Sequence, residues 1–170
     1  MKNWNNYKQT YRSESDIFDF ARSGDLRGFA NLLSQNPNLD LDAKNSKGYS
    51  ALMLAVYNDQ QDFCETLLRG GADANSMDSI GNTVLMACAY KGNLTLLKLL
   101  LHFGALTTYE NKSKMNVRDW AKMFGREDII HYLDDTFPSA ITPSKFTSIL
   151  KFIKLGFIML STKIKRDKNH

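Results

Sequence analysis

Leucine, methionine and alanine recur at helical spacing through the middle of the chain, in short runs that glycine and asparagine separate. Leu52, Leu54, Leu67 and Leu68 fall at intervals that place them on the buried stripe of amphipathic helices. Such short helices cannot bury an apolar face alone, so neighbouring units must stack. The pattern predicts helices near 16–23, 26–34, 50–58, 60–69, 83–91, 93–102, 117–124 and 127–134.

The middle of the chain repeats itself at an offset of 33 residues. Gly48-Tyr-Ser-Ala-Leu-Met-Leu-Ala55 reads onto Gly81-Asn-Thr-Val-Leu-Met-Ala-Cys88, and Gly71-Ala72 reads onto Gly104-Ala105. Glycine after a helix suits the left-handed conformation that ends it. A period of this length is typical of a solenoid built from one repeated supersecondary unit.

These residues resemble the ankyrin-repeat family. The family's first-helix motif, T-P-L-H-x-A, appears as Ser50-Ala-Leu-Met-Leu-Ala55 and Thr83-Val-Leu-Met-Ala-Cys88, and its second-helix ending appears as Leu67-Leu-Arg-Gly-Gly-Ala-Asp-Ala-Asn75. The resemblance covers roughly residues 13–134 and implies a β-turn followed by two antiparallel helices in each repeat. We therefore expect an all-α ankyrin-repeat solenoid of about four helix-turn-helix units, with an additional C-terminal helix.

The two outer repeats depart from the family pattern. The first repeat lacks a preceding hairpin, as an N-terminal cap would. The fourth carries Lys114 where the family has glycine and Arg118 where it has leucine, which indicates a C-terminal cap. The expected organisation is a polar segment at 1–12, repeats at 13–136, a linker at 137–144, and a basic apolar helix and tail at 145–170.

No grouping of reactive side chains supports an enzyme, and we expect no cofactor. His102, His131 and His170 each lack a second histidine or a cysteine at metal-ligand spacing, so no metal site is expected. Cys64 and Cys88 fall at inner helix positions, where a free thiol packs as a small apolar group. Two cysteines and a polar start favour the cytoplasm, or export by a route without a cleavable signal.

The positive charge belongs to the end of the chain. Residues 145–170 hold seven Lys and Arg against one Asp, a net of +6, which leaves −2 for residues 1–144. A duplex-binding body needs many cations on one face. We therefore expect no nucleic acid as a partner.

The family resemblance implies that a partner protein binds to the hairpin tips and to the exposed side of the first helices, the concave face. Tyr57, Tyr90 and Phe124 would form an aromatic stripe there, although tyrosines at these positions can also merely cover the seam between helices. The predicted partner-binding residues are Lys47, Tyr49, Tyr57, Asn58, Ile80, Asn82, Tyr90, Lys91, Met123 and Phe124.

The C-terminal segment leaves two main alternatives open. Phe146, Ile149, Ile153 and Phe157 fall on one helical face, which either packs on the fourth repeat or lies on a membrane surface or a partner. A spanning helix needs about 20 apolar residues, and two lysines interrupt this segment.

The sequence therefore favours a non-catalytic protein–protein interaction module. The alternative is a membrane-surface adaptor that uses residues 145–170. Small proteins of this kind resemble bacterial ankyrin-repeat proteins, which implies a host-directed effector, an immunity protein or an accessory protein of a partner enzyme.

Overall fold

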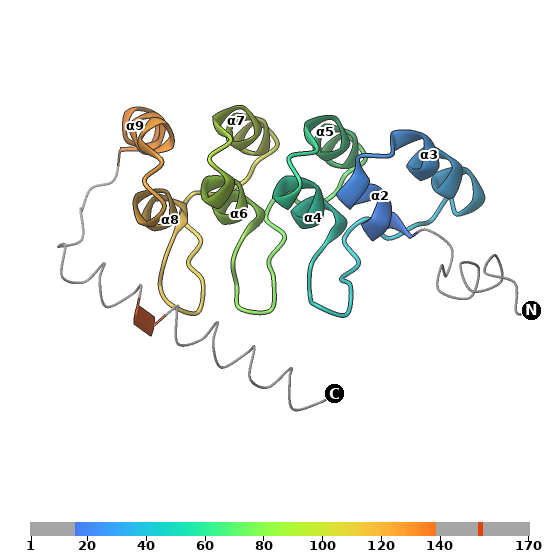
Figure 1. The fold of residues 1–170 in the computed structure, drawn as a ribbon, viewed down its shortest axis with the longest axis horizontal. Helices are drawn as coiled ribbons and strands as arrows, with labels where there is room; N and C mark the ends of the chain where they lie inside the picture. The colour runs from blue at the N-terminus through green and yellow to red at the C-terminus, as the bar shows by residue number, and fades with distance from the viewer. Residues whose placement is uncertain (1–15, 139–152, 155–170) are drawn as a thin grey trace, which may run out of the picture. The chain divides into compact units, whose positions relative to one another are not determined.

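Figure 1 shows the computed structural model, in which residues 16–138 and 153–154 are described. The chain divides into two compact units, Met1–Asp73 and Ala74–His170. Each unit is a pair of helical repeats.

The first unit contains α2 (Ile17–Ser23), α3 (Leu26–Gln35), α4 (Ala51–Tyr57) and α5 (Gln61–Arg69). Helix α2 packs on α3 and α4, and α4 packs on α5. An antiparallel bridge between Lys44 and Ser50 closes the hairpin before α4. The buried rings of Phe29 and Phe63 lie 5.0 Å apart and join α3 to α5.

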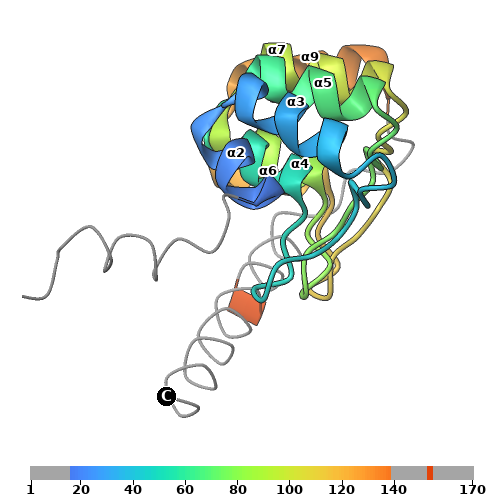
Figure 2. The same cartoon turned by 90° about the vertical axis from the view of Figure 1, so that its right-hand side faces the viewer.

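The second unit contains α6 (Val84–Lys91), α7 (Leu94–His102), α8 (Val117–Met123) and α9 (Glu127–Thr136). Helices α6 and α8 pack on one another and each packs on its own second helix, α7 or α9. Figure 2 views the hairpins that precede α6 and α8 from the side, and they project away from α7 and α9. We call α6, α8 and their hairpins the first-helix layer, and α7 and α9 the second-helix layer.

Short polar side chains start these helices where the sequence places them. The Asp16 carboxylate accepts hydrogen bonds from the Phe18 and Asp19 amides at 2.9 and 3.0 Å, and the Ser50 hydroxyl accepts from the Met53 amide at 3.2 Å. Such N-caps satisfy donors that the first helical turn leaves unpaired. The predicted helices are confirmed, with boundaries that agree within two residues.

The core lies between the first and second helices, and α4 and α6 are buried along most of their length. Every residue from Ala51 to Val56 and from Val84 to Ala89 is buried. Met86 is fully buried where the family has histidine, and its Sδ accepts a hydrogen bond from the Thr83 amide at 3.4 Å. A thioether is a weak acceptor. The methionine thus supplies a weak contact at the start of α6.

The fourth repeat keeps the ankyrin geometry despite its two unusual residues. Lys114 adopts the left-handed conformation of the glycine it replaces, with φ 59°. Arg118 reaches α9, where its Nε contacts the Asp134 carboxylate at 2.6 Å. Its Nη2 donates to the Leu133 and Phe137 carbonyl oxygens at 2.7 and 2.9 Å. The arginine therefore binds the C-terminal end of its own repeat's second helix.

Of the C-terminal segment, only Ile153 and Lys154 are described; both are helical and exposed. Ile153 is 65% exposed. Phe146, Ile149 and Phe157 lie outside the described residues. Within 16–138 and 153–154, no helix combines the length and the apolar character needed to cross a membrane.

Candidate partner-binding site

An aromatic pair lies at the ends of the two first helices of the second unit. Tyr90, near the end of α6, is 41% exposed. Its ring meets that of Phe124, the residue that follows α8, with centroids 4.8 Å apart and planes at 80°. The buried Trp120 backs Phe124 at 5.6 Å. Edge-to-face contacts of this kind stabilise aromatic pairs, so the exposed tyrosine ring rests on a fixed support.

Arg126 fixes the position of the same helix end. Its Nη2 donates to the carbonyl oxygen of Tyr90 at 2.7 Å. The side chain passes over Gly92, where an added Cβ would lie only 2.9 Å from Nε. Gly92 also has φ 80°, a left-handed conformation that favours glycine. The glycine therefore leaves room for the arginine, which connects the fourth repeat to the end of α6.

The first unit contains a neutral version of this contact. The amide of Gln60 donates to the carbonyl oxygen of Arg22 at 3.3 Å, and a Cβ on Gly24 would overlap the Gln60 side chain. We call both contacts latches. The sequence analysis missed them, although both side chains occupy the position directly after the helix-ending turn.

The first unit also contains an aromatic pair, in which the Tyr49 and Tyr57 rings lie 6.0 Å apart.

The hairpins of the second unit bond to one another rather than projecting singly. Lys112 donates its backbone N–H to the Ile80 carbonyl oxygen at 3.1 Å. The Asn111 amide donates to the Asn82 side chain at 2.7 Å, and Asn82 donates to Asp78 at 2.9 Å. Asn82 is only 2% exposed. Its prediction as a partner-binding residue is therefore wrong, because its side chain joins two hairpins.

The remaining predicted residues differ in accessibility. Tyr90 and Phe124 come together in the second unit, and Tyr49 and Tyr57 come together in the first. The Asn58 amide bonds to the Leu54 carbonyl oxygen at 2.7 Å, within its own helix. Lys47, Asn58 and Tyr90 are exposed, whereas Tyr49, Tyr57, Ile80, Lys91, Met123 and Phe124 are half-buried.

No described part of the chain assembles a reactive centre. Burial and the charge of Asp59 raise the pKa of the Cys64 thiol to about 12, so it stays protonated at neutral pH. The buried Cys88 thiol donates to the Asn93 carbonyl oxygen at 3.2 Å. His102 and His131 are exposed, and residues 16–138 hold no group of three side chains suited to a metal ion. His170 lies outside the described residues.

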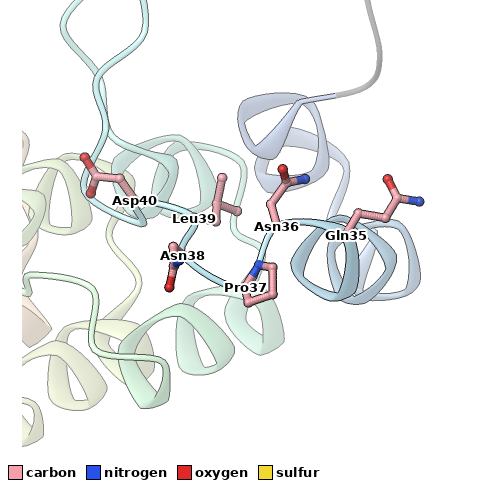
Figure 3. Close-up of a pocket in the computed structure, with 6 residues that line it drawn as sticks. All are labelled: Gln35, Asn36, Pro37, Asn38, Leu39 and Asp40. Carbon is pink, nitrogen blue, oxygen red and sulfur yellow. The ribbon is translucent and has the colours of Figure 1, made fainter.

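A hollow in the first unit is formed by the long turn at residues 35–40. Figure 3 shows that its labelled side chains point in different directions and do not converge on one point. Asp40 is the one ionisable residue among those that line it. A single carboxylate in an exposed turn supplies no pair of groups for acid–base chemistry.

The family profile described as "Ankyrin repeats (3 copies)" matches residues 52–136. The chain is 33% identical over 100 residues to mouse Protein fem-1 homolog A-like, which covers 59% of this chain and 15% of that protein. It is 37% identical over 87 residues to chicken Inversin, covering 51% of this chain and 8% of that protein. A putative ankyrin repeat-containing protein of Treponema pallidum is 30% identical over 104 residues, 61% of this chain and 35% of its own length.

The chain thus spans a small part of each of these relatives. What they share with it is the repeat, which is generally a non-enzymatic protein-interaction scaffold. The helix pairs, the hairpins and the profile match lead to the same assignment: the chain belongs to the ankyrin-repeat family.

Proposed function

We propose that the protein is a non-catalytic recognition module that binds a partner protein through its hairpins and first helices. The observation that carries this proposal is Tyr90, a 41% exposed ring held on Phe124 at the ends of α6 and α8. The Tyr49–Tyr57 pair offers a second aromatic contact in the first unit. The general role of ankyrin repeats supports the same conclusion.

The geometry of Tyr90 suits it to binding. Tyrosine buries a large area at an interface and has few rotatable bonds to immobilise. Here the Phe124 ring and the Arg126 latch already hold the end of α6, so little further ordering is needed when a partner binds.

The test begins with the full-length protein as bait in its native lysate, followed by calorimetry with the identified partner. Tyr90→Ala and Phe124→Ala should each weaken binding by about 1–2 kcal/mol, or roughly 5–30-fold in Kd. Tyr132→Ala is the matched control, because Tyr132 lies in the second-helix layer, where its ring contacts Lys98. That variant should bind as the wild type does.

Unfolding curves of the three variants separate binding from stability. A partner whose affinity is unchanged by Tyr90→Ala and Phe124→Ala together would contradict the proposal. Equal loss in Tyr132→Ala would assign the effect to stability or to the opposite surface.

A membrane-surface role is the second candidate, and the charge of the C-terminal segment is what suggests it. The net charge of +6 on residues 145–170 would attract an anionic surface, with about 1 kcal/mol for each basic residue close to it. Flotation with phosphatidylserine vesicles should retain the full-length protein at low salt and release it at high salt. A variant truncated after Ala140 should not float. Equal behaviour of both proteins would exclude this role.

A further inference from the structure

Charge is distributed unequally between the two layers of the second unit. The second-helix layer carries acidic side chains along α9, whereas the first-helix layer carries lysines. The acids of α9 are Glu127, Asp128, Asp134 and Asp135. The cations of the first-helix layer are Lys91, Lys112, Lys114 and Lys122, to which the latch adds the guanidinium of Arg126. Arg118 also belongs to α8, but it is engaged with α9.

The acids of the first-helix layer are largely satisfied within the layer. Asp78 accepts hydrogen bonds from the Ile80 and Asn82 amides and from the Asn82 side chain, all at 2.9 Å. Asp119 is 4% exposed and accepts from the Asn116 amide at 3.2 Å. Glu110 contacts Lys114 at 3.7 Å. With all formal charges counted, the layer holds five Lys and Arg against three Asp and Glu, so its net charge is 5 − 3 = +2.

We propose that the first-helix layer of the second unit binds an acidic, extended segment of the partner, with an apolar side chain anchored on Tyr90 and Phe124. This inference rests on the proposed function and adds the chemistry of the partner. Complementary charge favours encounter with such a segment, and like charge rejects a basic one.

Arg126 is the residue best placed to select a carboxylate near the anchor. Its latch uses an N–H of Nη2, and Nε is buried, so a partner can reach only the remaining N–H groups of the two terminal nitrogens. A guanidinium has five N–H donors and pairs with a carboxylate in a planar, two-pronged geometry. Because the latch already orients this side chain, a carboxylate beside Tyr90 meets a positioned donor group.

Lys112 and Lys114, in the hairpin before α8, place further positive charge at a distance from Tyr90 and Phe124. Helix α6 has eight residues, which correspond to a length of about 12 Å at 1.5 Å per residue. An extended peptide covers that distance with about four residues. Lys112 lies beyond the start of α6, in a hairpin where its Nζ bonds to the Ser79 carbonyl oxygen at 2.9 Å. A segment anchored at Tyr90 must therefore continue past α6, with more than about four extended residues, to place an acidic side chain near Lys112.

Selection from a random dodecapeptide display library on the immobilised full-length protein tests the inference. Enriched peptides should be net negative and should contain at least one aromatic or large aliphatic residue. Their affinity, measured by fluorescence polarisation with labelled synthetic copies, should fall when salt is raised. Replacing the acidic residues of a selected peptide by their amides should abolish most of its binding.

Two charge variants test whether the selected peptides bind to the first-helix layer. Arg126→Gln removes the charge and keeps an amide donor for the latch, as Gln60 provides in the first unit. Lys122→Glu reverses an exposed charge on α8. Each should weaken the selected peptides about three- to tenfold. Lys98→Glu makes the same change in the second-helix layer and should have no effect.

Enrichment of neutral or basic peptides, or no enrichment over the empty support, would overturn the inference. So would acidic peptides that bind Arg126→Gln and Lys122→Glu as they bind the wild type. Tyr90→Ala separates the proposed binding surface from the proposed acidic partner. If it weakens binding of peptides that are not acidic, the proposed function stands and the acidic partner does not. If no selected peptide responds to it, the proposed surface itself is wrong.

Discussion

Replacing Arg118 by methionine tests how the fourth repeat ends. Methionine keeps an unbranched apolar chain but removes the guanidinium, which bonds to the Leu133 and Phe137 carbonyl oxygens and to Asp134. The arginine side chain is only 13% exposed, whereas Asp134 is 53% exposed. An exposed ion pair contributes at most about 1 kcal/mol. Each carbonyl bond contributes about 0.5–1.5 kcal/mol, so we expect a total loss of about 2–3 kcal/mol.

Urea unfolding followed by circular dichroism measures that loss. Asp134→Asn is the control that weakens only the ion pair, and it should cost under about 1 kcal/mol. Amide exchange in the last turn of α9 should accelerate in Arg118→Met and remain near normal in Asp134→Asn. If Arg118→Met costs less than about 0.5 kcal/mol, or no more than Asp134→Asn, the arginine does not cap α9 and the reasoning fails.

Three further predictions concern the core and the backbone. Leu85→Ala should cost about 2–5 kcal/mol in denaturant unfolding, because this side chain is 1% exposed and its loss leaves a cavity; under about 0.5 kcal/mol would contradict its burial. Lys114→Gly should gain about 0.5–1 kcal/mol, since φ 59° is unfavourable for lysine, and Lys112→Gly is the control that should gain nothing. Burial raises the pKa of the Cys64 thiol to about 12, whereas the thiol of the unfolded chain has a pKa of about 8.5. The stability that the neutral thiol contributes is therefore complete below about pH 8.5 and is lost as pH rises toward 12. Between these pH values, the wild type should lose stability more steeply than Cys64→Ala.

The helices were predictable because local and tertiary signals agree along this chain. Asp16 and Ser50 cap helices at the places where the apolar stripes begin, and Gly24 and Gly92 end helices in the left-handed conformation. The interpretation of the fourth repeat as a cap also follows from single residues. Arg118 stands where the family has leucine, and its charged group bonds to the end of α9.

The site was less predictable because contacts between repeats depend on side-chain reach. Phe124 follows Tyr90 by one residue more than the repeat length, yet their rings touch, while Met123 stands at the repeated position. Asn82 carries the polar composition of an exposed hairpin, but its amide matches the hydrogen-bonding groups of Asp78 and Asn111. Such pairing follows from two hairpins lying side by side, which the order of residues in either hairpin does not reveal.

The two latches show which features of the site exceed the needs of the fold. Each latch requires a donor that reaches a carbonyl oxygen at the end of the preceding first helix, and a glycine that leaves room for the side chain. Gln60 meets this requirement without a charge. Arg126 meets it with a positive charge whose Nε has no protein partner among the described residues. Burying part of a guanidinium costs free energy unless it is compensated. Since glutamine supplies the same contact without a charge, the latch alone does not require arginine. An acidic partner beside Tyr90 would interact with the charge through the terminal nitrogens, because Nε itself is buried.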